Sequence, residues 1–177
     1  MLATFAQSKQ AMTEKKQTNM ERMFLVIDEV FDMRNDPLQL QVNDKVIAKL
    51  AQIHPATLSE YNEGEGPIAW VLVIPTTTEL MNRFVAGQLS EQALFDQTKP
   101  GMQYDALYLC SATTLPEYRG KGITKKLCLD AIKKISEGHP LKALFVWAFS
   151  PEGNMLAESV ARATGLPLLK REIKKLN

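Results

Sequence analysis

The sequence predicts an α/β protein in which a mixed β-sheet is covered by helices on both faces. Three apolar runs have the length and composition of strands, namely residues 68–74, 104–113 and 141–149. In the second half of the chain, strands alternate with segments of helical periodicity, and this order favours a partly parallel sheet. The 177 residues are 45% hydrophobic and 23% charged, which is typical of one globular domain.

The charge balance excludes some classes of function. The chain has 21 Lys and Arg against 20 Asp and Glu, a net charge of +1, which argues against a protein that mainly coats nucleic acid or an anionic membrane. The longest apolar runs, residues 68–75 and 143–149, fall far short of the about 20 residues that a membrane span needs. Residues 1–17 have no apolar core of signal-peptide length. We therefore expect a cytoplasmic protein with no nucleic-acid or membrane partner.

Cysteine and histidine usage argues against a metal site. The two cysteines, Cys110 and Cys128, are too few for a four-thiolate zinc site, and they lie in apolar runs where cysteine behaves as a small hydrophobe. The two histidines, His54 and His139, lie far apart in the sequence with no ligand spacing around them. We expect no metal, and we expect the cysteines to be a buried, reduced pair.

The first half begins with helical patterns. Residues 1–17 are polar and indicate an N-terminal extension. A helix should follow from Thr18 and end before Pro37, because five apolar residues recur between them at helical spacing. These residues are Met23, Phe24, Ile27, Val30 and Phe31. A second helix is expected from Asn43 to an interruption at His54. Its apolar face would consist of Val46, Ile47, Leu50 and Ile53.

A short helix is expected next, through Tyr61, followed by an exposed turn at residues 62–67. The run 68–74 has no polar alternation, so it predicts a strand that is buried on both faces. Helices are expected over residues 76–87 and from Ser90, which fits an N-cap. The inward residues of the first of these helices would be Leu80, Met81, Phe84 and Val85.

The second half predicts a regular alternation of elements. The expected order is a strand at 104–113, a helix at 120–136, a strand at 141–149, a helix at 154–164 and a last strand at 168–173.

One segment, residues 113–126, has a pattern that indicates chemistry. A strand ends there, a proline-marked turn follows, and a helix begins inside a glycine-rich loop. The first N–H groups of a helix lack partners within the helix and carry partial positive charge. Arg119, Lys121 and Lys125 add full charges, so the segment predicts a cradle for a diphosphate. The alternative is a glycine-closed turn with solvated lysines.

The stretch PEYRGKGIT, residues 116–124, resembles the acetyl-CoA loop of the GNAT family of N-acetyltransferases. The family pattern is Arg or Gln, two residues, Gly, one residue, then Gly or Ala. Arg119, Gly122 and Thr124 hold the three fixed positions, and Thr124 departs from the usual Gly or Ala. The segment does not match a Walker phosphate loop or a dinucleotide fingerprint. The likeness continues at Asn154, on a helix in which the family often has an asparagine that contacts the pantetheine arm.

This resemblance implies a single GNAT-type domain with an acceptor-side half at residues 18–103 and an acetyl-CoA-binding half at 104–177. It implies that the cofactor pyrophosphate lies on backbone N–H groups of the loop and that the pantetheine pairs with the end of the preceding strand. The residues implied in acetyl-CoA binding are Ala112, Thr113, Thr114, Arg119, Gly120, Lys121, Gly122, Ile123, Thr124 and Asn154.

The resemblance leaves the catalytic groups open. The N–H of Thr114 would polarise the thioester carbonyl, as in an oxyanion hole. Tyr108 is a candidate proton donor, with a core aromatic as the alternative, and Asp105 is a further candidate at the start of that strand. Glu79 has a similar claim. The position at which the family often has a tyrosine is Ala161 here, so proton transfer relayed by water also stays open.

The expected function is transfer of an acetyl group from acetyl-CoA to a primary amine of a small molecule. A non-catalytic acyl-CoA-binding or sensing module is one alternative, motivated by Ala161. Acetylation of a protein N-terminus or lysine is another. A homodimer is also considered, with its interface in the helical segments of residues 1–61.

Overall fold

The computed structural model describes residues 17–32 and 39–172, and it contains one five-stranded sheet with the order β1-β2-β3-β4-β5. The first three strands are antiparallel neighbours, whereas β3, β4 and β5 run parallel. The predicted mixed sheet is therefore confirmed. The strands are β1 (Leu58–Asn62), β2 (Pro67–Thr76), β3 (Ala106–Thr114), β4 (Ala143–Val146) and β5 (Leu168–Lys170).

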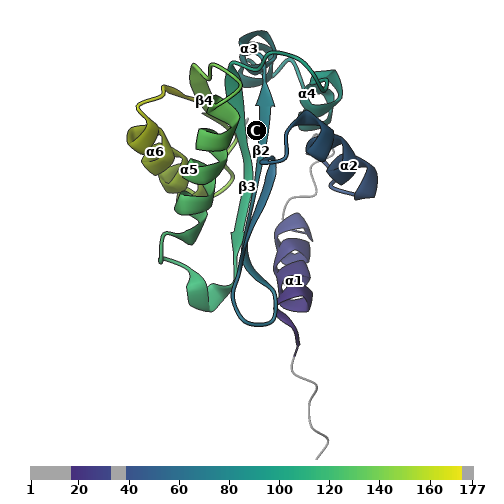
Figure 1. The fold of residues 1–177 in the computed structure, drawn as a ribbon, viewed down its shortest axis with the longest axis vertical. Coiled ribbons are helices and arrows are strands. Elements are labelled where there is room, and N and C mark those ends of the chain that lie inside the picture. The colour runs from purple at the N-terminus through teal and green to yellow at the C-terminus, as the bar shows by residue number, and fades with distance from the viewer. Residues whose placement is uncertain (1–16, 33–38, 173–177) are drawn as a thin grey trace, which may run out of the picture.

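Helices cover both faces of this sheet, as predicted. On one face lie α1, α2, α3 and α4, and on the other lie α5 and α6 (Figure 1). A short 3-10 helix, η1, joins β3 to the loop before α5. The bounds are α1 (Asn19–Asp32), α2 (Asp44–Ile53), α3 (Thr78–Val85), α4 (Glu91–Gln97), η1 (Pro116–Tyr118), α5 (Ile123–Ser136) and α6 (Pro151–Thr164).

Two large apolar clusters form most of the core, one on each face of the sheet. The cluster under α2, α3 and α4 includes Leu50, Ile74, Phe84, Leu94 and Phe145, which are all at most 1% exposed. The cluster under α5 and α6 includes Val73, Leu107, Ile135, Leu144 and Val160. β2 contributes alternate residues to the two clusters, which is why its sequence is apolar without a break.

Local capping signals place two helices where the sequence predicted them. The side chain of Asn43 accepts hydrogen bonds from the N–H groups of Lys45 and Val46, both at 3.1 Å, and starts α2. Ser90 accepts from the N–H of Ala93 at 3.0 Å and starts α4. Each oxygen satisfies first-turn N–H groups that have no partner within the helix.

The short helix predicted through Tyr61 is wrong, because this segment is strand β1. It pairs with β2 from Leu58↔Leu72 to Glu60↔Trp70 and beyond, so its backbone is satisfied by a neighbour rather than within itself. The turn that follows is confirmed, and it closes the hairpin with a hydrogen bond of 3.1 Å from the N–H of Glu63 to the carbonyl of Gly66.

Several predicted boundaries shift. The helix expected from residue 120 begins at Ile123, because Gly120 and Gly122 have left-handed φ values of 73° and 74°. The helix expected from residue 154 begins at Pro151, where Ser150 caps it by accepting from the N–H of Gly153 at 3.1 Å. The strand expected at 141–149 is the shorter β4.

Two residues expected on buried helical faces are exposed. Phe24 of α1 is 53% exposed and lies edge-on to Trp70, while Ile47 of α2 is 42% exposed. Met23 and Leu50, on the same two helices, are buried as expected. The expectations for residues 1–16, for the chain at 33–38 and for residue 173 lie outside the described residues.

Both cysteines carry reduced thiols, but only Cys128 is buried as expected, since Cys110 is half-buried. Cys110 packs against the cluster under α2, α3 and α4, whereas Cys128 of α5 is buried in the cluster on the opposite face. Burial raises the pKa of the Cys128 thiol to about 12, which keeps that group protonated and unreactive. Among the described helices, none combines the length and apolar character that would carry it across a bilayer.

Candidate functional site

The central feature of the site is the part of β3 that extends beyond the end of its neighbour β4. The two strands pair in parallel from Ala106↔Ala143 to Leu109↔Val146, where β4 ends. β3 continues to Thr114 beyond that last pair, with Ser111 and Ala112 exposed. The edge of β3 that faced β4 is therefore open along these residues, and we call this region the fork.

Backbone direction at the fork follows from one hydrogen bond. The N–H of Leu115 donates to the carbonyl of Ile68 at 2.9 Å, toward β2. Because polar groups of successive strand residues point to opposite edges, those of Thr114 and Ala112 point to the fork and those of Thr113 point to β2. The Nε–H of Arg119 donates to the carbonyl of Thr114 at 3.3 Å, which agrees with this direction. The sequence predicts that Ala112, Thr113 and Thr114 pair with the amides of a ligand. Of these three, Ala112 and Thr114 direct their backbone N–H and C=O groups to the fork and can do so.

The loop after β3 leads to an uncapped helix. Gly120 and Gly122 both have left-handed φ, and a Cβ built on either would meet no heavy atom within 4 Å. The space in front of the loop is therefore open. Gly122 holds the N-cap position of α5 and offers no side chain, so no side chain caps the first N–H groups of α5. The other described α-helices are capped by Thr18, Asn43, Thr77, Ser90 and Ser150.

Positive charge surrounds this uncapped end. Arg119 and Lys121 are exposed, and the Lys121 ammonium lies 4.8 Å from the centre of the Tyr118 ring. Lys125 follows in the first turn of α5 and is half-buried. Partial charges at the helix end and full charges on these side chains have the same sign, so the arrangement suits a bound diphosphate.

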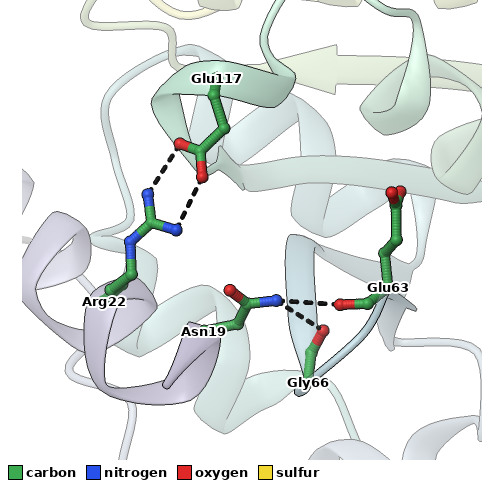
Figure 2. Close-up of polar contacts among 5 residues, drawn as sticks. All are labelled: Asn19, Arg22, Glu63, Gly66 and Glu117. Atoms are coloured by element: carbon green, nitrogen blue, oxygen red, sulfur yellow. Dashed lines mark hydrogen bonds and ion pairs between the residues drawn. The ribbon is translucent and has the colours of Figure 1, made fainter. Parts of the chain in front are cut away.

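The acidic residue nearest in sequence, Glu117, is neutralised by α1. Both Nη atoms of Arg22 lie 2.7 Å from its two carboxylate oxygens (Figure 2). The hydrogen bond from Arg22 lowers the pKa of the Glu117 carboxyl to about 2, so the ion pair persists through the physiological range. Because its charge is paired with Arg22, the Glu117 carboxylate lowers the positive electrostatic potential around Arg119 and Lys121 only slightly.

Helix α1 also contacts the β1–β2 hairpin turn. The side-chain N–H₂ of Asn19 donates to the carbonyl of Glu63 at 3.0 Å and of Gly66 at 3.4 Å (Figure 2). Below these contacts, Met23, Ile68 and Leu115 form a third buried cluster. The helix thus joins the hairpin to the loop that carries the glycines. Sequence reasoning missed this role of Arg22, because its partner lies 95 residues away.

Asn154 lies on α6, which begins where the chain leaves β4. Because β3 and β4 are parallel, the start of α6 and the loop before α5 are at the same end of the sheet. The Asn154 side chain is half-buried and donates to the carbonyl of Ser150 at 3.4 Å. Ser150, and not Asn154, is the N-cap of this helix.

Tyr108 is part of the core. Its side chain is fully buried, and its hydroxyl donates to the carboxylate of Glu91. Burial, and then the charge of Glu91, raise the pKa of Tyr108 well above its usual value. The second oxygen of Glu91 accepts from the N–H of Leu40 at 2.8 Å. Sequence reasoning missed Glu91, because a first-turn glutamate normally faces solvent.

Asp105 and Thr114 lie at opposite ends of β3. Asp105 directly precedes the nine-residue strand and Thr114 ends it, so they are separated by roughly 30 Å at about 3.3 Å per residue. The Asp105 carboxylate accepts from the N–H of Thr78 at 2.6 Å and contacts the Lys142 ammonium at 3.3 Å. Burial opposes its charge, but these partners outweigh burial and lower its pKa. Asp105 therefore accepts from the first residue of α3, whose N-cap is Thr77, and does not join the fork.

Aromatic residues line the sheet face beside the fork. Trp147 follows β4 directly and is 6% exposed. The centre of its ring system lies 4.5 Å from the ring centre of Phe149 and 6.1 Å from that of Phe84. The guanidinium of Arg171 lies 4.3 Å from the centre of the Trp147 ring. Arg171 also donates to the carbonyl of Leu89 at 2.6 Å. These contacts of Trp147 and Arg171 fill the sheet face beside the fork.

The other candidate residues are accounted for structurally. Ala161 is buried in α6 with no hydroxyl to offer, and the Glu79 side chain is 81% exposed and lies 3.9 Å from Arg83. The ring centres of His54 and His139 lie 6.1 Å apart. Within the described parts of the chain, no group of three or more His, Cys, Asp and Glu side chains could hold a metal ion.

Comparison with protein-family models, with curated proteins and with solved structures gives no match for this chain.

Proposed function

We propose that this protein is an acetyl-CoA-dependent N-acetyltransferase that acts on a primary amine of a small molecule. One observation supports this more than any other. The open edge of β3 leads directly into a loop with two left-handed glycines and an uncapped α5 terminus. An extended edge followed by an anion cradle matches the two recognition needs of an acyl-CoA, whose arm carries amides and whose diphosphate carries charge.

The residues present fit such a ligand. The N–H groups of Ile123 and Thr124 and the backbone at Gly120 and Gly122 would receive the diphosphate, with Arg119 and Lys121 beside it. The pantetheine amides would pair with the fork-facing groups of Thr114 and Ala112, as an added strand pairs with a sheet edge. Asn154, at the same end of the sheet, would contact the arm.

The chain would assist acyl transfer mainly by position and polarisation. The amine nitrogen attacks the thioester carbonyl carbon, the C–S bond breaks, and the amine loses a proton while the CoA thiolate gains one. The N–H groups of Ala112 and Thr114 are the donors available to the carbonyl oxygen as negative charge develops there. Holding both reactants side by side at the fork would supply the entropic part of the rate enhancement.

We assign the proton transfer to water at the fork rather than to a side chain. The Tyr108 hydroxyl is buried and donates to Glu91, and Asp105 lies at the other end of its strand. Ala161 stands where the resembled family often has an acid. An exposed strand end gives water access to the reacting atoms.

The same observation favours a second candidate, a non-catalytic acyl-CoA-binding module. Such a module needs the cradle and the open edge but no proton donor. It would bind acetyl-CoA without accelerating its aminolysis.

A thiol-release assay separates the two candidates. Purified protein is mixed with acetyl-CoA and a panel of primary amines, and CoA thiol is followed over time. The proposed enzyme releases CoA faster with at least one small amine than with buffer alone. Tight acetyl-CoA binding with no amine-dependent release would support the binding module instead. The Arg119→Glu variant is the control, because both candidates require it to bind acetyl-CoA more weakly.

A further inference from the structure

Strand β1 forms one edge of the sheet, and within the described residues it pairs only with β2. The N–H of Val73 donates to the carbonyl of Thr57 at 2.8 Å, so the polar groups of Thr57 face β2. Successive strand residues point these groups to opposite edges. Those of Ser59 therefore also face β2, whereas those of Leu58 and Glu60 face outward. The outer edge thus offers N–H and C=O groups to another strand.

The side chains of β1 do little to prevent pairing at this edge. Exposed edges are commonly protected by Lys, Pro or a projecting charge, and the sequence of β1, LSEYN, has a single charged residue. That residue, Glu60, is held by its own sheet. Its carboxylate accepts from the indole N–H of Trp70 at 3.2 Å and from the Asn62 side chain at 2.9 Å. The charge is therefore directed back over the strand.

Apolar side chains flank the edge on both faces of the sheet. Residues directly opposite each other in an antiparallel pair share a face. Leu58 lies opposite Leu72, in the cluster under α2, and is 43% exposed. Tyr61 lies opposite Ala69, in the cluster under α5, and is 40% exposed. A strand added at this edge would therefore cover apolar surface on both faces.

The two ends of β1 differ in charge. After its last residue, the hairpin turn carries the exposed Glu63 and Glu65. Before its first residue lies the end of α5, because the ring centres of His54 and His139 are 6.1 Å apart. The charged residues at this end of α5 are Lys133, Lys134 and Glu137. An antiparallel strand of the same sequence would bring the acidic turn of one copy beside this net positive end of the other.

We propose that β1 pairs with β1 of a second copy of this chain, antiparallel about a twofold axis, so that two sheets become one. A register with Glu60 opposite Glu60 of the second copy would set like charges face to face and is disfavoured. Pairing about Ser59 places Leu58 opposite Glu60 of the second copy instead. It also places the turn at residues 63–65 opposite residues 53–55 of the second copy, at the net positive end.

This interface lies in the part of the chain where the sequence suggested a homodimer, but a strand forms it and not a helix. The dimer goes beyond acyl transfer and does not depend on it.

The test combines mass and amide exchange of the full chain. Sedimentation equilibrium should give a mass near twice the 19.8 kDa of the chain. Hydrogen exchange followed by NMR should show the outward amides of Leu58 and Glu60 protected as well as that of Ser59. A monomeric mass at the concentration of the NMR sample would overturn the proposal. So would a dimer in which the Leu58 and Glu60 amides exchange freely.

Two variants at one position isolate the strand pairing. Leu58→Pro removes the outward N–H together with the side chain, whereas Leu58→Ala removes the side chain alone. Proline is tolerated on an edge strand where its nitrogen faces away from the sheet, so Leu58→Pro should fold with a Tm close to that of Leu58→Ala. Its dimer Kd should be about tenfold higher, the value of one good hydrogen bond. Equal Kd values in the two variants would contradict the pairing.

A charge variant decides the matter if Leu58→Pro fails to fold. Glu63→Lys would set like charges beside the end of α5 in the second copy, so it should raise the dimer Kd several-fold at low salt. Glu152→Lys, at an exposed position on α6, makes the same change away from the edge and is the matched control. The same dimer Kd in both charge variants would contradict the proposed arrangement.

Discussion

The two Nη atoms of Arg22 on α1 each lie 2.7 Å from one oxygen of the Glu117 carboxylate (Figure 2). The pair joins a helix near the start of the chain to the turn just before the glycine loop. Its structural effect is to fix η1, and its electrostatic effect is to remove an unpaired negative charge from beside Arg119 and Lys121. Planar, two-point contacts of this kind are more directional than ordinary surface ion pairs.

The first prediction concerns this ion pair. Arg22→Gln should lower acetyl-CoA affinity several-fold, because Glu117 would then stand uncompensated beside the diphosphate. The double variant Arg22→Gln, Glu117→Gln should recover most of that loss. Calorimetric titration measures both. Lys126→Gln, which breaks the exposed Lys126–Asp130 pair at 3.2 Å, is the matched control and should change affinity less. A double variant weaker than Arg22→Gln alone would refute the electrostatic role.

The pH dependence of that pair has a definite sign. In the native state the pKa of the Glu117 carboxyl is about 2, below its ordinary value of 4.5. The ion pair with Arg22 therefore contributes its full stabilisation once the pH is above 4.5. Its contribution is lost as pH falls from 4.5 toward 2.

The second prediction concerns Gly122, whose φ is 74°. Gly122→Ala should lower the free energy of unfolding by about 1 kcal/mol, from backbone strain alone, because the new Cβ meets no atom within 4 Å. It should also weaken acetyl-CoA binding by crowding the cradle. Gly138→Ala is the control, since Gly138 has no positive φ and open space. Urea unfolding of both variants decides, and equal losses would mean that backbone strain at Gly122 is not the cause.

The third prediction separates structure from catalysis at Tyr108. Tyr108→Phe removes the hydroxyl that donates to the buried Glu91, so it should lower the free energy of unfolding by about 1–3 kcal/mol. Acetyl-CoA affinity and amine turnover should stay close to those of Tyr104→Phe. That variant is a matched control, because Tyr104 is also buried and donates to the carbonyl of Lys99 at 2.7 Å. A turnover loss of tenfold or more confined to Tyr108→Phe would identify Tyr108 as the proton donor.

The fourth prediction concerns pH and His54. Burial, and then the nearby charge of His139, lower the pKa of His54, with Glu137 acting weakly in the opposite direction. The native state therefore takes up a proton less readily than the unfolded chain, whose histidines titrate near 6.5. Stability should fall as pH drops below about 6.5. Urea midpoints at about pH 7.5 and pH 5.5 measure the fall, which His54→Gln should reduce. An unchanged fall in that variant would assign the acid sensitivity elsewhere.

Elements with local signals could be predicted from the sequence. Asn43 and Ser90 mark helix starts within three residues of the N–H groups they bind, so their pattern is visible along the chain. The unbroken apolar run of β2 likewise predicts a buried strand from the sequence alone. β1 was missed because its short, mixed sequence, LSEYN, becomes a strand only by pairing with β2. Tertiary hydrogen bonding decided its conformation, and local propensity did not.

The candidate site divides in the same way. The glycine loop with Arg119 and Lys121 is contiguous in sequence, so its shape as a cradle could be expected before the structure. Glu91, Arg22 and the fork depend on contacts between distant segments, and no spacing rule exposes them. Predicted roles for Asp105 and Tyr108 rested on the strand alone. Only the three-dimensional arrangement shows that one lies at the far end and that the other faces the core.

The most direct measurement is a thermal-shift titration of the parent protein and Arg119→Glu with acetyl-CoA, CoA and ATP. At 100 times the dissociation constant, a ligand of the native state adds about 2.7 kcal/mol, which should raise Tm by roughly 5–11 °C in a chain of this size. Our account predicts that rise with acetyl-CoA and CoA but not with ATP, and a smaller rise in Arg119→Glu. No shift with acetyl-CoA or CoA, or equal shifts with ATP, would contradict the assignment of the cradle and the fork to an acyl-CoA.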